Sequence, residues 1–228
     1  MLKGKIYKEA NAIAGFGGKL AFATSLGRDT AVMLHVMSRL LHLPDHRFFT
    51  WTRYPCMLPY QQRYLEQIEG LYGISVEVSL FPEDMGMKRK VWWEDYMDRN
   101  GCSLVLFGER KDESLQRRGM LNPLKDGIDY RFRKAFPLRS FTARNIRGYV
   151  NAHRLPLSVE YKIGIKGNLD EFRGPRAYAL RHYISELDYQ CAVAQDPNVE
   201  IDYVRFVNDP EFRAECEKSE GWFNKGAT

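Results

Sequence analysis

Short apolar runs alternate with stretches of helical periodicity along much of the chain. The first apolar run, Leu20–Ala23, leads into a polar turn. The residues after this turn recur at helical spacing and predict one buried helix face made of Met33, Val36, Met37, Leu40 and Leu41. This order predicts a strand, a loop and a helix. The helix is expected to end at Leu43, because Pro44 disfavours helix in the residue before it.

Later segments continue the alternation. Apolar or β-branched runs predict strands at Arg47–Thr52, Ile74–Leu80 and Leu104–Phe107. Between them, helices are predicted over Tyr64–Tyr72, ended by Gly73, and over much of Met85–Arg99. Strands separated by helices pair in parallel through right-handed crossovers. The sequence therefore predicts an α/β fold with a parallel, doubly wound, Rossmann-like sheet.

The remainder of the chain is predicted to be mainly helical. Thr142 is expected to cap a helix that runs towards His153. A further helix with a partly apolar face is predicted over Asp170–Gln190. We therefore divide the chain into an α/β domain at residues 1–161 and a helical C-terminal extension at residues 162–228.

Composition bears on where in the cell the protein is expected. No apolar run approaches the roughly 20 residues that cross a bilayer. The polar N-terminus lacks the apolar centre of a signal peptide, so a cytoplasmic protein without membrane contact is expected. The four cysteines stand far apart, without a CxxC pair or a histidine at ligand spacing. This argues against a zinc site, an iron–sulfur cluster and a disulfide framework, and predicts small buried cysteines.

The polar turn after Leu20–Ala23 offers groups that suit an anion. It contains Thr24, Ser25, Leu26, Gly27, Arg28, Asp29 and Thr30. At a strand-to-helix junction, the free N–H groups of the first helical turn and the positive end of the helix dipole point into the loop. The glycine allows close backbone approach, and the arginine adds a cation. The turn is therefore a candidate phosphate site. The alternative is an ordinary turn in which Asp29 caps the helix.

A second polar loop follows the strand at Leu104–Phe107. It reads GERKDESLQRRGM and carries Gly108, Arg110, Glu113, Ser114, Arg117 and Arg118. Ligands of parallel sheets bind beyond the carboxyl ends of the strands, so the two loops are expected to converge. Arginine forks suit phosphate or sulfate, and Glu113 is placed to orient one of them through an ion pair. The alternative is a surface loop with solvated charges.

The order and spacing of both loops resemble the phosphoadenosine-phosphosulfate (PAPS) reductase family, within the adenine nucleotide alpha hydrolases and N-type ATP pyrophosphatases. Residues 25–30, SLGRDT, resemble the family's pyrophosphate loop, SGGxDS or SFGxDS. The later family signature GxRxxESxxR is matched by Gly108, Arg110, Glu113, Ser114 and Arg117. A softer match covers Phe136–Tyr161, where Phe141 replaces the family's tryptophan. The resemblance extends over about residues 19–161.

The resemblance implies ATP or a related adenine nucleotide, with its phosphates on the first loop and its distal phosphate or sulfate gripped by the second. It implies an ATP pyrophosphatase type of reaction, in which the bond between the α and β phosphates is cleaved, an acceptor is adenylated and Mg²⁺ neutralises the pyrophosphate. Asp29 or Glu113 would then help to hold the metal or its waters. Arg28, Arg110 and Arg117 would stabilise charge during transfer.

Departures from the family pattern leave other functions open. Of the family's aspartate-threonine-glycine trio after the second strand, only Thr52 is present, as a candidate nucleotide contact. The reductase tail ECGLH is absent, although Cys216 follows a glutamate. A PAPS or adenylyl-sulfate reductase with Cys216 as a non-standard thiol is therefore one alternative. A catalytically silent, nucleotide-dependent module of a nucleic-acid modification complex is another.

The net charge of +5 is unevenly spread and points to an anionic ligand or partner. Basic residues outnumber acids over residues 110–154. A nucleic-acid or protein partner at this region is one interpretation, with Arg131, Arg133 and Lys134 as the positions to neutralise. A solvated charged face is the simpler interpretation. A homodimer is a further expectation, because the C-terminal third either covers the sheet or forms a dimer contact.

Overall fold

The computed structural model describes residues 1–52, 57, 59–80, 89–158, 186–195, 201, 204–205, 207–212 and 214. The chain divides into two compact units. The first comprises Met1–Arg53 and Leu65–Pro156, and the second comprises Tyr54–Tyr64 and Leu157–Thr228. Both candidate loops belong to the first unit.

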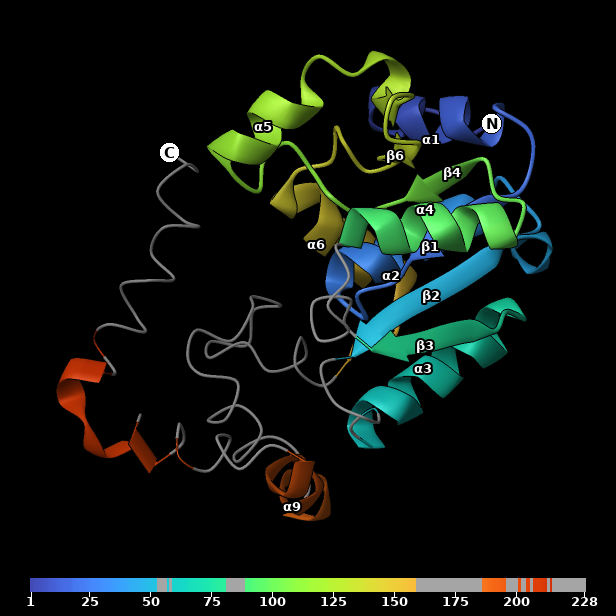
Figure 1. Ribbon diagram of the computed structural model, residues 1–228. Coiled ribbons are helices and arrows are strands. Elements are labelled where there is room, and N and C mark those ends of the chain that lie inside the picture. Colours follow the sequence, from blue (N-terminus) through green and yellow to red (C-terminus); the bar gives the residue numbers. More distant parts are fainter. Residues whose placement is uncertain are drawn as a thin grey trace. The chain divides into compact units, whose positions relative to one another are not determined.

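A six-stranded sheet forms the centre of the first unit (Figure 1). The strands are β1 Leu20–Ala23, β2 Arg47–Thr52, β3 Val76–Leu80, β4 Leu104–Leu106, β5 Ile128–Asp129 and β6 Lys134–Ala135. They lie in the order β3-β2-β1-β4-β6-β5, and every neighbouring pair is parallel except β5 with β6. The first four strands lie where the sequence predicts them, and the mostly parallel sheet is confirmed.

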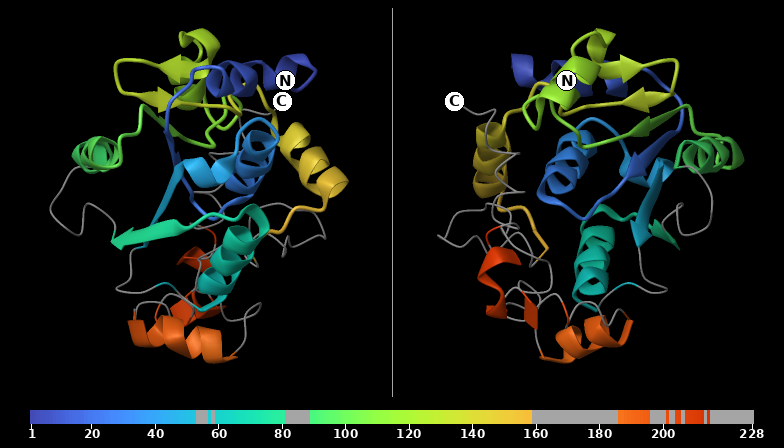
Figure 2. Two further views of the ribbon diagram at one scale, coloured as in Figure 1. Left: turned by 90° about the vertical axis from the view of Figure 1, so that its right-hand side faces the viewer. Right: turned by 60° about the vertical axis from the view of Figure 1, so that its left-hand side comes forward.

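Helices cover both faces of this sheet. Their bounds are α1 Lys8–Ala14, α2 Arg28–Ser38, α3 Pro59–Tyr72, α4 Arg89–Arg99, α5 Leu115–Leu121 and α6 Ala143–His153, with short 3-10 turns at Lys5–Tyr7, Leu43–Asp45 and Lys125–Gly127. Figure 2 shows α4 on one face of the sheet and α2 and α6 on the other. The doubly wound arrangement is therefore confirmed.

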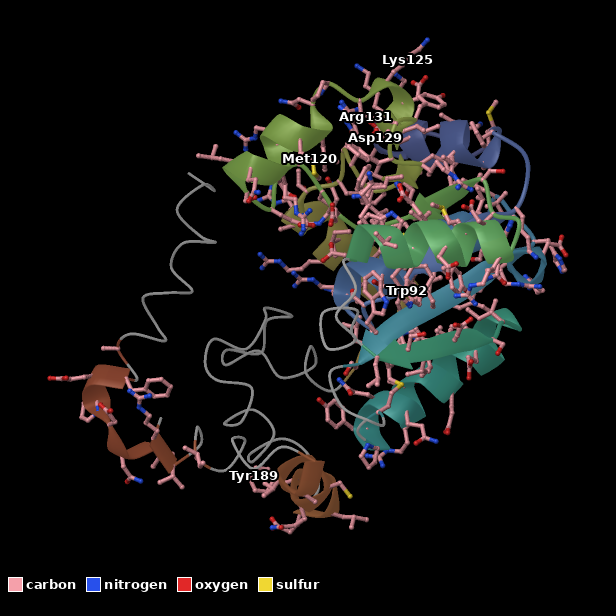
Figure 3. All side chains as sticks on the ribbon, in the orientation of Figure 1. Trp92, Met120, Lys125, Asp129, Arg131 and Tyr189 are labelled. Atoms are coloured by element: carbon pink, nitrogen blue, oxygen red, sulfur yellow. The ribbon has the colours of Figure 1, made fainter. Side chains whose placement is uncertain are left out.

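Apolar side chains from alternate strand positions meet α4 in one buried layer. Ala21, Phe49 and Val105 lie in the same cluster as Trp92 and Tyr96 of α4. Figure 3 labels Trp92. The rings of Trp92 and Tyr96 stack with their centroids 5.2 Å apart, and Phe49 lies 4.7 Å from Tyr96. Burying each large apolar side chain contributes about 1.5–3 kcal/mol. This layer fixes the strands from whose ends the candidate loops emerge.

Two helix ends were predicted correctly from single residues. Gly73 ends α3 with φ of 63°, and Ile74 N–H donates to Glu69 O at 3.2 Å. Thr142 caps α6, because its Oγ1 accepts from Asn145 N at 3.2 Å while Asn145 Oδ1 accepts from Thr142 N at 2.9 Å. Both signals are local in the sequence, which is why the sequence alone located them.

Several boundaries differ from the prediction. α2 ends at Ser38 rather than Leu43, because tight turns follow, with Leu40 N–H donating to Met37 O at 2.9 Å. Leu40 and Leu41 are consequently only half-buried. β3 begins at Val76 rather than Ile74, and β4 ends at Leu106 rather than Phe107.

Four short elements were not predicted at all. They are α1, α5, β5 and β6, and none is long enough to display a periodic apolar pattern. β6 forms because β4 supplies its partners: Val105 N–H donates to Arg133 O at 2.8 Å and Phe107 N–H to Ala135 O at 2.9 Å. Their placement depends on tertiary hydrogen bonds.

The second unit contains the described helix α9, Glu186–Gln195. Most of the helix predicted over Asp170–Gln190 lies outside the described residues. Cys102 is buried as predicted, whereas Cys191 is half-buried; Cys56 and Cys216 lie outside the described residues. Within the described part of the chain, none of the helices has the length and apolar character needed to cross a membrane.

Candidate functional site

The two candidate loops meet at the carboxyl edge of the sheet. Asp29 Oδ1 accepts a hydrogen bond from Arg110 Nε at 2.6 Å, although the two residues are 81 positions apart. A Cβ added to Gly108 would lie 3.4 Å from both the carbonyl carbon of Asp29 and the nitrogen of Thr30. Glycine therefore lets the chain after β4 approach the first turn of α2 closely. The convergence predicted from the parallel-sheet rule is confirmed.

Hydroxyl groups hold the SLGRDT loop in shape. Thr24 donates to Phe49 O through both its backbone N (2.8 Å) and its Oγ1 (2.9 Å), which ties the end of β1 to β2. Ser25 N–H donates to Thr30 Oγ1 at 3.2 Å, and the two hydroxyl oxygens lie 2.9 Å apart. Hydrogen bonds thus hold both ends of the loop.

The start of α2 differs from one prediction. Gly27 is the N-cap residue and makes no side-chain cap bond, so the interpretation of Asp29 as the cap is wrong. Asp29 lies inside the first turn, where its carboxylate turns to Arg110. Arg28, in the same turn, is buried, with 9% of its surface exposed. The N–H groups of this turn and the positive end of the helix dipole therefore face the loop, an arrangement that suits an anion.

Leu26 is held in an unfavourable backbone conformation. Its φ is +57°, in the left-handed region that non-glycine residues rarely occupy. This conformation costs roughly 1–2 kcal/mol in a non-glycine residue. Leu26 is also buried, so its apolar side chain offsets part of that cost.

Arg110 is the centre of a buried ion-pair network. Its side chain is only 6% exposed and contacts the carboxylates of Asp29, Asp112 and Glu113. Its backbone N–H also donates to Glu113 Oε1 at 2.9 Å. The guanidinium is therefore directed at protein carboxylates, and its geometry fits a residue that organises the two loops better than one that grips a distal phosphate.

Asp112 extends this network to a third element. One of its oxygens contacts Arg110, and the other accepts from Ala143 N at 2.6 Å. Ala143 is the first residue of α6, so Asp112 anchors the start of that helix to the arginine loop. Sequence reasoning did not assign Asp112 a role. In the sequence, Asp112 is only an acid two residues after an arginine, and this spacing does not indicate that Asp112 contacts Ala143 of α6.

Ser114 and Arg117 form the outer part of the site. Ser114 is the N-cap of α5, and its Oγ accepts from Arg117 N at 3.1 Å. The Arg117 side chain is 39% exposed and pairs with Glu109 at 2.7 Å and Glu113 at 3.7 Å. Arg117 is therefore partly free to meet a ligand, whereas Ser114 has a structural role in the start of α5. The predicted contact Thr52 ends β2, and its side chain lies outside the described residues.

The basic stretch is largely engaged within the protein. Arg133 donates to Ser103 O at 3.3 Å and to Asp98 Oδ1 at 2.5 Å. Lys134 lies 4.2 Å from the Trp93 ring centroid, and burial lowers the pKa of its ammonium group. These contacts hold β6 against β4 and α4. Arg133 and Lys134, two of the three positions named for a nucleic-acid partner, thus already contact other groups of the protein.

Glu113 provides a pH-dependent contribution to stability. Burial raises its pKa from 4.5 to about 7, opposed mainly by Arg110. The folded chain therefore binds this proton more tightly than the unfolded chain does. The contribution of Glu113 to the free energy of unfolding should fall as pH rises from about 4.5 to 7. Glu113→Gln should remove this loss, which amounts to at most about 3 kcal/mol for such a shift.

Urea unfolding of both proteins at pH 5, 6, 7 and 8 checks this expectation. The difference in stability between Glu113→Gln and wild type should shift in favour of the variant across that range. Glu77→Gln, at an exposed position of β3, is the control and should run parallel to wild type. Parallel curves for Glu113→Gln as well would contradict the burial argument.

The charge of the network bears on magnesium, which the family resemblance implies. Among the described residues, no group of three histidine, cysteine or acidic side chains is placed to hold a metal ion. The network nevertheless combines four carboxylates (Asp29, Glu109, Asp112 and Glu113) with two guanidiniums, Arg110 and Arg117. Mg²⁺ is commonly held by one or two carboxylates plus substrate phosphates. The excess of carboxylates over guanidiniums is compatible with that mode.

No protein-family model and no curated protein matches the sequence. The structure is similar to FMN adenylyltransferase from Candida glabrata in complex with FMN and the ATP analogue AMPCPP, with a TM-score of 0.52 and 14% identity over 72% of this chain. This chain spans 60% of that protein.

Two further structures show weaker similarity. PAPS reductase from Candida auris has a TM-score of 0.46 and 10% identity, covering 68% of this chain and 83% of that one. NAD synthetase from Campylobacter jejuni has a TM-score of 0.48 and 11% identity, covering 97% and 94%. Taken with the sheet order, the match to the adenylyltransferase shows that the two chains share an α/β fold with a mostly parallel sheet.

Proposed function

We propose that residues 1–161 form an ATP pyrophosphatase-type domain that binds ATP or a related adenine nucleotide with Mg²⁺. The observation that carries the proposal is the ion pair of Asp29 with Arg110, which joins the first turn of α2 to the arginine loop at one edge of the sheet. The adenylyltransferase of similar fold was solved with an ATP analogue, which supports an adenine nucleotide as the ligand.

The proposed reaction assigns different tasks to the residues of the network. An acceptor oxygen or nitrogen attacks the α-phosphorus, the bond to the β-phosphate breaks, and pyrophosphate leaves with the bonding electrons. Mg²⁺ supplies charge neutralisation for that leaving group. The first turn of α2, with Arg28, holds the phosphates, and the half-exposed Arg117 meets developing negative charge. Arg110 keeps the two loops in register.

Binding is expected to require Mg²⁺, because the network carries more carboxylates than guanidiniums. Isothermal titration calorimetry should show that MgATP binds and that ATP with EDTA binds at least about tenfold more weakly. A thermal-shift panel of ATP, AMP, adenylyl sulfate and PAPS identifies the nucleotide, since ligand at 100 times its Kd stabilises by about 2.7 kcal/mol.

Product analysis separates the functions. Release of pyrophosphate from MgATP in the presence of candidate acceptors is the expected result. Binding without pyrophosphate release would favour the catalytically silent module, and sulfite release from PAPS would favour the reductase. Absence of both nucleotide binding and pyrophosphate release would refute the proposal.

A further inference from the structure

Arg139 lies outside the proposed site, between β6 and α6, but its side chain reaches the far end of α5. Its Nε donates to Leu121 O at 2.7 Å, and its Nη2 donates to Asn122 O at 2.9 Å. Leu121 and Asn122 are the last residue and the C-cap of α5, where backbone carbonyls lack partners inside the helix. The guanidinium therefore satisfies this helix end and its negative dipole.

Glu9 of α1 fixes the direction of that guanidinium. Arg139 Nη1 donates to Glu9 Oε1 at 2.9 Å, and Ser140 Oγ donates to the same oxygen at 2.8 Å. The Glu9 side chain is 3% exposed and that of Arg139 is 14% exposed. A Cβ at Gly127 would lie 2.9 Å from Glu9 Cγ, so the glutamate is held by close packing as well. Three sides of the guanidinium are thus committed to protein groups.

The contacts of Arg139 continue into the proposed site. Its backbone O accepts from Lys111 N at 3.2 Å, inside the arginine loop. The helix that it caps, α5, begins at the Ser114 cap and carries Arg117. A helix of seven residues is not stable by itself in water. The position of α5, and with it that of Arg117, consequently depends on what holds its two ends.

We infer that Arg139 is a positioning residue for the proposed nucleotide site, and that Glu9 locks its guanidinium. The inference rests on the proposed function. Ser114 holds the first end of α5 and Arg139 the second, so both ends are fixed relative to the arginine loop. Loss of the Arg139 fork would leave Asn122 O to water and Leu121 O with the 3.3 Å hydrogen bond from Leu124 N, and would let Arg117 move away from its place opposite Glu113.

Two readouts separate positioning from general stability. Met120 of α5 is 41% exposed, and its methyl group reports on this helix by NMR of methyl-labelled methionine (Figure 3). Affinity for MgATP is measured by calorimetry at a temperature where each variant is folded. Arg139→Gln removes the guanidinium. Arg139→Lys keeps the positive charge, but a single ammonium group cannot reach Leu121 O, Asn122 O and Glu9 Oε1 together.

In Arg139→Gln, the Met120 resonance should shift or broaden, and MgATP should bind about tenfold more weakly. A loss of this size is typical when a residue that orients a binding group, without touching the ligand, is replaced. Arg139→Lys should restore the Met120 resonance and the MgATP affinity only in part. Glu9→Gln should change the resonance and the affinity in the same direction as Arg139→Gln does. Lys8→Gln is the matched control, because Lys8 also lies on α1 and pairs with Asp126 at 3.1 Å but is 69% exposed. It should change neither readout.

Variants that lower the Tm while leaving the Met120 resonance and the MgATP affinity unchanged would overturn the inference. If wild-type protein binds no nucleotide, the proposed function fails, and the Met120 resonance by itself still decides whether Arg139 holds α5. If Arg139→Gln does not fold, the Met120 resonance and the MgATP affinity of Arg139→Lys and Glu9→Gln test the inference instead.

Discussion

Arg110→Ala is expected to lower the free energy of unfolding by about 3–5 kcal/mol, as when one partner of a buried ion pair is removed. The side chain is 6% exposed and neutralises three carboxylates, those of Asp29, Asp112 and Glu113. Without it, these acids repel one another in a partly desolvated place. The Tm should fall by about 10 °C, since 1 kcal/mol shifts a domain of this size by roughly 2–4 °C.

Calorimetry or urea unfolding at pH 7 measures this effect, with Arg118→Ala as control. Arg118 lies on α5, which follows the arginine loop, and is exposed, so its removal should change stability by less than about 0.5 kcal/mol. The destabilisation by Arg110→Ala should shrink at pH 4 to 5, where the orphaned acids take up protons. A loss below about 1 kcal/mol at pH 7 would contradict the central role of Arg110.

Asp29→Asn is expected to reduce pyrophosphate release by about 100-fold or more, the effect of removing one preorganised electrostatic group from a reaction centre. The amide keeps an oxygen for the hydrogen bond from Arg110, so the loops should still meet. The substitution removes the negative charge of the carboxylate that we propose binds Mg²⁺. Stability should fall by only about 1 kcal/mol. Alanine is a poorer choice, because it also removes the oxygen that accepts the hydrogen bond from Arg110.

Asp112→Asn is the matched control for this experiment. Asp29 and Asp112 both contact Arg110, and both side chains are 28% exposed. Asp112, however, turns its second oxygen to the start of α6, whereas Asp29 lies in the first turn of α2. Comparable stability losses with a much larger activity loss for Asp29→Asn are expected. Equal activity losses would assign the effect to the network as a whole and count against a metal role for Asp29.

The fold was largely predictable because its main elements carry local signals. β1 to β4 are apolar runs, α2 and α3 show helical periodicity, and Gly73 and Thr142 mark helix ends. β5, β6 and α5 carry no such signal, because two to seven residues are too few to show a period. They exist through hydrogen bonds from β4 and through the caps of α5.

The site was predictable only in part. Parallel strands direct their carboxyl ends to one edge, so the meeting of the two loops followed from the strand order. The ion pairing of Glu113 with arginines of its own loop was predicted correctly, but the partners of charged side chains far apart in the sequence were not. Asp29 was predicted to help hold the metal or its waters, with a helix cap as the alternative, and Arg110 to contact a phosphate or sulfate. Their ion pair with each other was not predicted. Arg139 and Glu9, 130 positions apart, gave no signal of their ion pair.

Local chemistry in the amino-acid order was enough to give the strand-helix alternation, the two polar loops and the edge of the sheet where they lie. These depend on neighbours within a few positions, which periodicity and turn residues encode directly. The charge pairing of the site was decided by folding in three dimensions. The pairing of carboxylates with guanidiniums depends on their distance and burial. Both are set only when the folded sheet brings residues 29, 110 and 112 together.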